Sequence, residues 1–131
     1  MKVEKLRGTE RRLYELVAPL VMRPNVLRQN NNYPFKTTEQ YVWFVALEGD
    51  QVLGFMPVEV KDEVAVINNY YVMGEDTGVL NTMLQKVIAS FGKIYQLQSV
   101  THIHHLSVFQ ESGFEVIRTW KLYMKMEYRK M

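Results

Sequence analysis

A strand-like run turns through a short glycine-containing loop into an amphipathic helix over residues 70–92, YYVMGEDTGVLNTMLQKVIASFG. Unpaired N–H groups in the first turn of a helix, together with the helix dipole, favour an anion such as a phosphate. Glu75 and Asp76 stand just before that turn, where a carboxylate satisfies the helix N-terminus without a ligand. The segment therefore predicts either an anion site or a self-capped turn. The residues that an anion would meet are Thr77, Gly78, Val79 and Leu80.

Three histidines lie close together further along the chain, at positions 102, 104 and 105. Imidazole titrates near neutral pH, so a histidine is the natural general base in this sequence. His102 and His105 are three residues apart, and on a helix both could face one metal ion. A third ligand is not evident, because Glu111 lies more than a turn away. We therefore predict no metal site and keep His102 and His105 as candidate bases, with plain surface histidines as the alternative.

A polar stretch over residues 30–41, NNNYPFKTTEQY, carries aromatic side chains that could contact a substrate. Tyr33 and Phe35 could stack on it, and the asparagines before them could hydrogen-bond to it. A polar loop anchored by two aromatic residues is the alternative. Tyr33 and Phe35 are the substrate contacts that the sequence predicts.

Composition narrows the class of protein. The chain has 131 residues, which predicts one domain spanning residues 1–131. Apolar residues make up 47 % and charged residues 23 %, which favours a globular protein over a disordered one. There is no cysteine, which excludes disulfides and thiolate chemistry and fits a reducing compartment. A net charge of +2 does not indicate nucleic-acid binding, and no apolar run suggests a membrane span or signal peptide. We therefore expect a cytoplasmic protein without nucleic-acid or membrane partners.

The N-terminal part has helical patterning. Apolar residues follow helical spacing from Leu13 to Val21, and Thr9 is a suitable cap for a helix that starts at Glu10. Pro19 interrupts the pattern, so we expect this helix to kink or end nearby. A second short helix is expected from Pro24.

The middle of the chain has strand patterning, rich in β-branched and aromatic residues. Three runs show it: residues 41–47, 52–60 and 64–72. Tight turns at EGDQ and KDE should make neighbouring strands antiparallel. Pro57 is expected at an edge or a bulge. In the third run, strand alternation puts Tyr70 and Tyr71 on opposite faces, so that one can face a cleft while the other packs beneath a helix.

The C-terminal half alternates between helices and strands. The clearest helical stripe runs from Gly78 to Phe91, with Gly92 placed as a cap. A strand over residues 94–100 follows, and the helix between it and the third run should make those two strands parallel. A helix stopped by Gly113 comes next. The final alternating residues are expected to place one set on a single face: Trp120, Leu122, Met124, Met126 and Tyr128.

Element order and two local signatures resemble the GNAT superfamily of acyl-CoA N-acyltransferases. VLGFMPVEV, at residues 52–60, is similar to the family's strand that often carries Gly-Phe. VFQESGFEV, at residues 108–116, is similar to the family's late lYeklGF segment. The resemblance covers residues 3–128. It implies an α/β (α+β) fold with a mixed, mostly antiparallel sheet, flanking helices and one parallel strand pair at a splayed cleft.

The resemblance also implies a coenzyme A site. In that family the helix after the third meander strand binds the pyrophosphate through the motif Q/R-x-x-G-x-G/A. Here Glu75 stands at the first position, Gly78 at the middle glycine, and Leu80 at the last position, where it is expected to crowd the phosphates. The motif is therefore degenerate, since one of its three positions survives.

Acetyl-CoA is the co-substrate that the resemblance implies. It would lie in the gap between the strands at residues 64–72 and 94–100. The backbone of Tyr71 and Val72 would pair with the pantetheine arm. Phe109 would adjoin the cofactor, because it occupies the place of the family's usual tyrosine four residues before the glycine of Gly-Phe.

Transfer in this family is direct attack of an amine on a thioester, which needs a base and often an acid. Phe109 replaces the acid and has no proton to give. Asn68 stands near the family's usual glutamate base and can orient a water but cannot take a proton. The remaining catalytic candidates are Tyr71, His102 and His105, and positioning alone supplies much of the rate in such reactions.

The leading hypothesis is an acetyl-CoA-dependent N-acetyltransferase that acts on a primary amine of a small molecule or a peptide. The alternative is a non-catalytic GNAT-like domain that binds a small molecule or a protein partner. A weaker possibility is a homodimer paired through its aromatic C-terminal strand.

Overall fold

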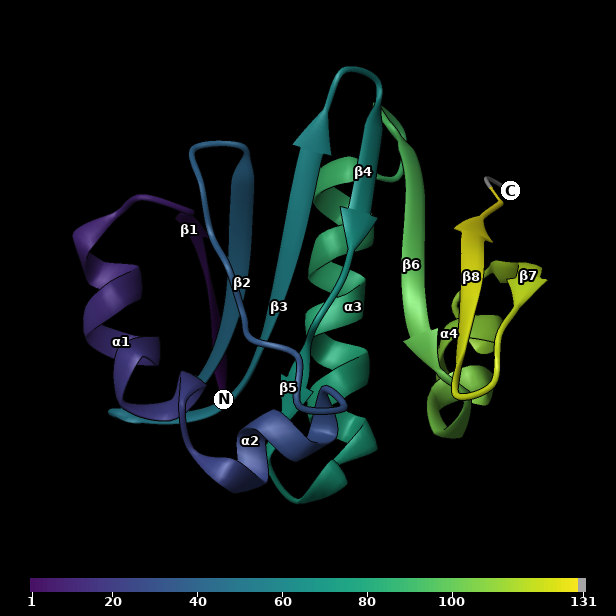
Figure 1. The fold of residues 1–131 in the computed structure, drawn as a ribbon. Coiled ribbons are helices and arrows are strands. Elements are labelled where there is room, and N and C mark those ends of the chain that lie inside the picture. Colours follow the sequence, from purple (N-terminus) through teal and green to yellow (C-terminus); the bar gives the residue numbers. More distant parts are fainter. Residues whose placement is uncertain (130–131) are drawn as a thin grey trace.

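The computed structural model describes residues 1–129. Its strands are β1 (Lys2–Arg7), β2 (Tyr41–Glu48), β3 (Gln51–Lys61), β4 (Val64–Ile67), β5 (Tyr71–Val72), β6 (Gln96–His102), β7 (Phe114–Thr119) and β8 (Tyr123–Tyr128). Its α-helices are α1 (Arg11–Val21), α2 (Pro24–Gln29), α3 (Thr77–Phe91) and α4 (Leu106–Glu111). Short 3-10 turns cover Met73–Glu75 and Ile103–His105 (Figure 1). Within the described residues, no helix has both the length and the apolar character needed to cross a membrane.

All the strands join one sheet in the order β1-β2-β3-β4-β6-β8-β7, with β5 pairing β3 beside β4. The pair β4–β6 is parallel and the other pairs are antiparallel. This confirms the predicted mixed α/β fold, in which the α3 crossover makes the strands on either side of it parallel.

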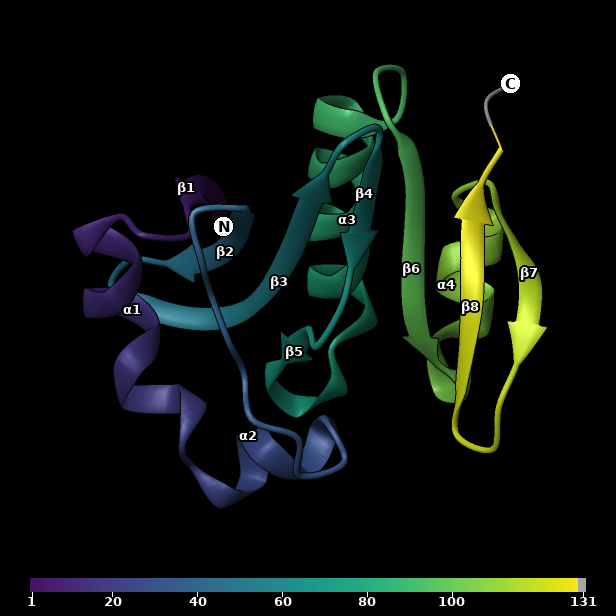
Figure 2. The same ribbon diagram turned by 45° about the horizontal axis from the view of Figure 1, so that its top comes forward.

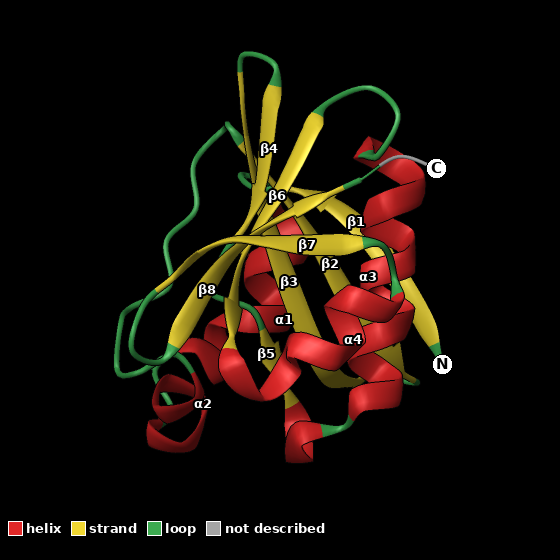
Figure 3. Ribbon diagram, turned by 90° about the vertical axis from the view of Figure 1, so that its right-hand side faces the viewer, coloured by secondary structure: helices red, strands yellow, loops and turns green. Residues whose placement is uncertain are grey.

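Helices cover both faces of the sheet. Strand alternation sends Phe44 of β2 into the core beneath α3, and its neighbour Trp43 into a second core beneath α1. The apolar stripe of α3 is buried as its spacing predicts. Figure 3 shows α2 and α3 on opposite sides of the sheet. The two cores hold the sheet rigid up to the place where β4 and β6 part.

The third strand-like run is broken into β4 and β5 instead of being continuous. Asn69 lies between them with a φ of 59°, a left-handed conformation that asparagine tolerates. Pro57 of β3 lies opposite this break: its carbonyl accepts the N–H of Asn68, and its missing N–H would point the same way. Pro57 therefore occupies an interruption of the ladder and not an edge strand.

The break opens the sheet. β6 runs beside β4 only from Gln96, opposite Val64, to Ser99, opposite Ile67. Beyond that point the chain returns to β3 through β5, while the rest of β6 pairs with β8 alone. Figures 1 and 2 show the two segments diverging below their paired part. The splayed parallel strand pair expected from the resemblance is therefore present.

Two expectations near the N-terminus are wrong. The sequence did not predict β1, because its residues are mostly polar and only Leu6 among them is buried. The helix does not begin with a Thr9 cap: α1 follows Glu10, whose carboxylate accepts the N–H of Arg7 and leaves the helix without a side-chain cap. Pro19 lies inside α1 near its end.

The C-terminal run also differs from its expected form. Met124 and Met126 are buried, but Trp120 and Leu122 lie in the turn before β8 and are 41 % and 39 % exposed. β8 lies between β6 and β7, so the last strand is not an edge that a second copy could pair with. At that end of the sheet the edge belongs to β7.

Candidate functional site

Three hollows follow one another along the cleft. The outer pocket has a volume of about 560 Å³, and its lining includes Asn68, Trp120 and Tyr123. The inner hollow has about 10 Å³ and shares Asn69, Val100 and Tyr123 with the outer pocket. The helix-side hollow has about 270 Å³. It shares three residues with the inner hollow, namely Gln29, His102 and His105. Their shared lining residues place these hollows next to one another, and we call the three together the passage.

The strand edge at Val72 faces this passage, and Gln29 occupies it. The Gln29 side-chain amide donates to the Val72 carbonyl at 2.6 Å and accepts the Val72 N–H at 3.1 Å. Both groups point away from β3, because Gly54 of β3 lies on the other side of Val72. A single amide from α2 thus satisfies both backbone groups of Val72, one of the two residues whose backbone the resemblance assigns to the pantetheine arm.

The N-terminus of α3 is occupied as well. The Asp76 carboxylate accepts the N–H groups of Gly78 at 2.9 Å and Val79 at 3.2 Å, and the Asp76 carbonyl accepts that of Leu80 at 3.1 Å. This is a helix N-cap, in which a carboxylate takes the place of an anionic ligand. The Leu80 side chain is 1 % exposed and belongs to the core. The Leu80 side chain therefore points into the core, and the side chain at the first N–H groups of α3 is that of Asp76.

A hydrogen-bonded chain closes the narrow part of the passage. The Tyr70 hydroxyl lies 2.7 Å from His105 Nδ1, and His105 Nε2 lies 3.0 Å from Glu75 Oε2. The backbone N–H of His102 donates to the Tyr70 oxygen at 3.3 Å, so the hydroxyl proton is free to point to Nδ1. In the Nε2–H tautomer of His105, Nδ1 accepts from Tyr70 and Nε2–H donates to Glu75. Burial raises the pKa of Tyr70 far above its ordinary value, so Tyr70 remains a proton donor.

His102 ends β6 and caps the turn that follows it. Its Nδ1 accepts the N–H of His104 at 3.1 Å, so the neutral ring carries its proton on Nε2. Burial lowers the pKa of His102, and the neighbouring His104 and His105 lower it further, against a smaller opposite effect of Glu75. In this arrangement the lone pairs of both His102 and His105 are engaged in hydrogen bonds. Among residues 1–129 no group of three potential ligands is placed to hold a metal ion.

The structure separates the other predicted catalytic residues. Asn68 lines the outer pocket. The Tyr71 ring packs against Phe55, 5.4 Å between centroids, in the core beneath α1. Its neighbour Tyr70 is therefore the tyrosine that reaches the cleft. Phe109 is fully buried, with its ring centroid 5.8 Å from that of Tyr70.

The two aromatic residues of the polar loop also have different surroundings. Tyr33 is 63 % exposed and lines the outer pocket. Phe35 packs edge-on against Phe55, with 5.0 Å between centroids, and anchors the loop to the core. Phe35 therefore anchors the loop, as the alternative interpretation expects, and Tyr33 stays a predicted substrate contact.

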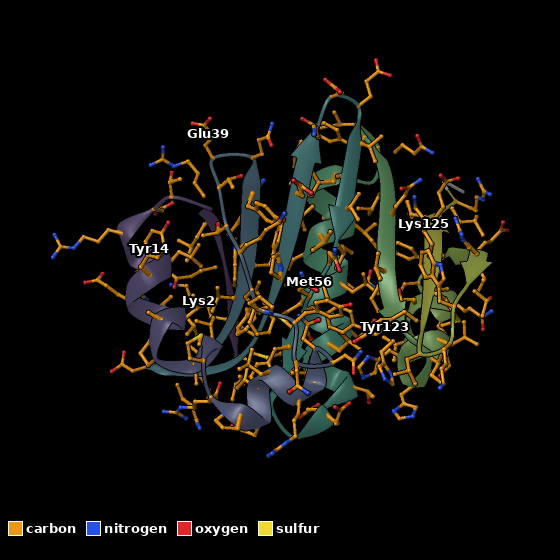
Figure 4. The ribbon with its side chains drawn as sticks, viewed as in Figure 1. Lys2, Tyr14, Glu39, Met56, Tyr123 and Lys125 are labelled. Carbon is orange, nitrogen blue, oxygen red and sulfur yellow. The ribbon has the colours of Figure 1, made fainter. Side chains whose placement is uncertain are left out.

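Several residues at the cleft were not predicted as site residues: Gln29, Lys36, Trp120 and Tyr123. Gln29 and Val72 are 43 positions apart in the sequence, and no local pattern predicts a contact between them. For Tyr123 the only sequence signal is its position in an alternating run. In the structure its hydroxyl is buried and has no hydrogen-bond partner among the described residues. Figure 4 shows Tyr123 near the lower ends of β6 and β8.

Comparison of the sequence with models of protein families and with curated proteins gives no match. Solved structures do match. Escherichia coli ElaA is 13 % identical with a TM-score of 0.77, over 98 % of this chain and 99 % of that one. An acyl-CoA N-acyltransferase from Pseudomonas aeruginosa is 13 % identical with a TM-score of 0.76, over 98 % and 100 %. The PaiA N-acetyltransferase from Thermoplasma acidophilum, in complex with coenzyme A, is 14 % identical with a TM-score of 0.61, over 99 % and 100 %. The chain has the GNAT fold, and at these identities the likeness establishes the fold alone.

Proposed function

We propose that this chain is an acetyl-CoA-dependent N-acetyltransferase of primary amines whose cofactor cleft is closed by its own side chains when no ligand is bound. One observation carries the proposal: the groups that close the cleft have the same chemistry as coenzyme A, an amide and an anion. An amide from Gln29 pairs with the Val72 strand edge, and a carboxylate from Asp76 holds the N–H groups at the start of α3. An amide followed by an anion is also the order of a pantetheine arm and its pyrophosphate.

These residues fit coenzyme A once the side chains of Gln29 and Asp76, here called the stand-ins, move aside. The Val72 backbone would hold the pantetheine amide, and Gly78 and Val79 would donate to a phosphate. Arg28, which lines the helix-side hollow, supplies a cation that the degenerate motif lacks at Glu75. Gln29, Glu75 and Asp76 can each turn to another rotamer, so opening the cleft requires no change of fold.

The reaction is direct transfer to the amine. The neutral amine nitrogen attacks the thioester carbonyl carbon, so that a C–N bond forms as the C–S bond breaks. The amine gives up one proton to water, and the coenzyme A thiolate leaves and takes up one proton. Asn68 would orient the amine or a water from the outer pocket. Tyr70, held in its protonated form, would donate a hydrogen bond inside the passage.

A second candidate is a non-catalytic GNAT-like domain that binds a small molecule or a protein partner. The same closed contacts favour it, as does the engagement of the lone pairs of His102 and His105. Phe109 in place of an acid agrees with it too. On this hypothesis the stand-ins are permanent, and the outer pocket alone takes a ligand.

Isothermal titration with acetyl-CoA, and with free coenzyme A as a second titrant, tests the proposal. The informative variant is Asp76→Asn, which keeps a good N-cap but removes the charge that faces the phosphates. We expect wild-type protein to bind acetyl-CoA and the variant to bind about two- to five-fold more tightly.

The matched control is Asp50→Asn, the same change at an exposed position in the turn between β2 and β3, and it should leave affinity unchanged. Absence of binding by both wild type and Asp76→Asn at millimolar acetyl-CoA would rule out the acyltransferase and leave the second candidate.

A further inference from the structure

The outer pocket is lined mainly by flat and apolar groups. Tyr33, Trp120 and Tyr123 supply aromatic rings from two distant parts of the chain, and Pro34 and Val100 supply aliphatic surface. A pocket of about 560 Å³ with such walls suits a planar apolar body, because aromatic faces contribute contact area with little loss of side-chain freedom.

Lys36 is the charged side chain among the described residues that line the pocket. Its described lining contains Lys36 and several asparagines but neither aspartate nor glutamate. Arg118 lies over the Trp120 ring, 5.2 Å from its centroid, and adds a second cation nearby. A polyamine or an aminoglycoside needs carboxylates to hold its additional ammonium groups. This pocket offers none and places cations there instead.

The inner end of the pocket is narrow and carries an unsatisfied polar group. The inner hollow, at about 10 Å³, has room for little more than one water-sized group. The Tyr123 hydroxyl, in its wall, is buried and has no hydrogen-bond partner among the described residues. Such a group gains by meeting a ligand or a water. A slender polar end can reach it, whereas a branched or bulky end cannot.

From these features we infer the class of acceptor, an inference that rests on the proposed function. The acceptor is an arylalkylamine: a primary amine on an unbranched alkyl chain joined to a planar aromatic body, with no second positive charge. The body lies in the outer pocket against Tyr33 and Trp120. The amine enters the narrow end, where the Tyr123 hydroxyl and Asn69 meet it.

Direct binding tests this inference without needing catalysis. Ligand-observed NMR titration of the whole chain would compare 2-phenylethylamine with spermidine, each with and without acetyl-CoA. We expect 2-phenylethylamine to bind and spermidine to bind at least about ten-fold more weakly. Tyr33→Ala and Trp120→Ala should each weaken 2-phenylethylamine binding about three- to ten-fold. Tyr14→Ala, which removes an exposed tyrosine from α1 outside this pocket, should not.

Charge reversal provides a second test. Lys36→Glu should improve spermidine binding, whereas Lys86→Glu, the same change on an exposed position of α3, should not. Spermidine that binds wild-type protein as tightly as 2-phenylethylamine would overturn the inference. So would 2-phenylethylamine binding that neither Tyr33→Ala nor Trp120→Ala weakens.

Failure of the two proposals can be told apart. Binding of 2-phenylethylamine without acetyl transfer would support the pocket assignment and contradict the transferase. Acetyl transfer to spermidine in preference to 2-phenylethylamine would support the transferase and overturn the pocket assignment.

Discussion

The two sides of the cleft differ in how their hydrogen-bonding groups are satisfied. On the helix side, Gln29 and Asp76 pair with backbone groups at Val72 and at the start of α3, and the Tyr70–His105 pair fills the passage. On the other side, the outer pocket stays open and the Tyr123 hydroxyl has no partner in the described part of the chain. Backbone N–H and C=O groups are strong and obligatory, so the chain supplies them with partners even without a ligand.

The difference separates two kinds of recognition. In a site built from backbone groups, side chains of the same chain can take the positions that a ligand would fill. A pocket built from exposed side chains can stay open, because water satisfies most of them. On the proposed function, the contacts of Gln29 and Asp76 bear on the cofactor, and the unpaired Tyr123 hydroxyl bears on the acceptor.

The largest effect is expected at Gly54 of β3, where the helix side of the cleft is attached to the sheet. A Cβ at Gly54 would lie 2.7 Å from the Tyr71 carbonyl and 3.0 Å from the Met83 side chain. Gly54→Val should push β5 off β3 and destabilise the protein by about 3 kcal/mol, as measured by urea unfolding. The control is Gly78→Ala, whose Cβ meets only Asp76 Oδ1 at 3.2 Å and should leave stability nearly unchanged. Equal stability of Gly54→Val and wild type would contradict this anchoring.

The next largest effect on stability is expected from removing the Tyr70 hydroxyl on the helix side of the cleft. Tyr70→Phe leaves His105 Nδ1 and the backbone N–H of His102 without their shared partner. We expect a loss of about 1–3 kcal/mol in the free energy of unfolding, since buried polar groups are costly to leave unpaired. A neutral effect in urea unfolding would mean that the chain across the passage contributes nothing to stability.

A tyrosine-to-phenylalanine change at Tyr123, in the outer pocket, should have the opposite effect on stability. Tyr123→Phe removes a buried hydroxyl that has no partner, so the ligand-free protein should gain up to about 1 kcal/mol. Acceptor binding should weaken in the same variant, which ligand-observed NMR would detect. If Tyr70→Phe and Tyr123→Phe both destabilise by similar amounts, the contrast between the two sides fails.

The smallest expected effect is a pH dependence at His102. Its pKa is lowered in the folded protein from the ordinary value of 6.5, chiefly by burial. The unfolded chain therefore binds the proton more readily. The stability linked to His102 is present above about pH 6.5 and is lost as the pH falls through the lowered pKa. His102→Gln should flatten this part of the stability profile measured by thermal unfolding between pH 5 and pH 7, and an unchanged profile would contradict the assignment.

Much of the fold follows from local patterns. The apolar stripe of α3 and the β-branched strands β2 and β3 are strong signals, and they formed as expected. The polar edge strand β1 has no such signal, because an edge strand needs few buried residues. The break between β4 and β5 depends on Asn69 and Pro57 acting together across neighbouring strands. The residue pattern of one strand alone therefore cannot predict the break.

The site was predicted less completely than the fold, for a related reason. The start of α3 could be located, and the capping effect of a carboxylate there was one of its two interpretations. Gln29 could not be located, because its role depends on a contact with Val72 that only the folded chain creates. Strand alternation separated Tyr70 from Tyr71 but could not say which of them faces the cleft.

The most direct test of a self-closed cofactor cleft is an amide-resolved NMR titration of the ¹⁵N-labelled protein with coenzyme A. If the ligand replaces the stand-ins, the resonances of Val72, Gly78 and Val79 should shift together with the Gln29 side-chain amide. All should follow a single binding curve, while amides of α1 stay in place. Binding that leaves those four sets of resonances unmoved, or no binding at all, would contradict the proposed cleft.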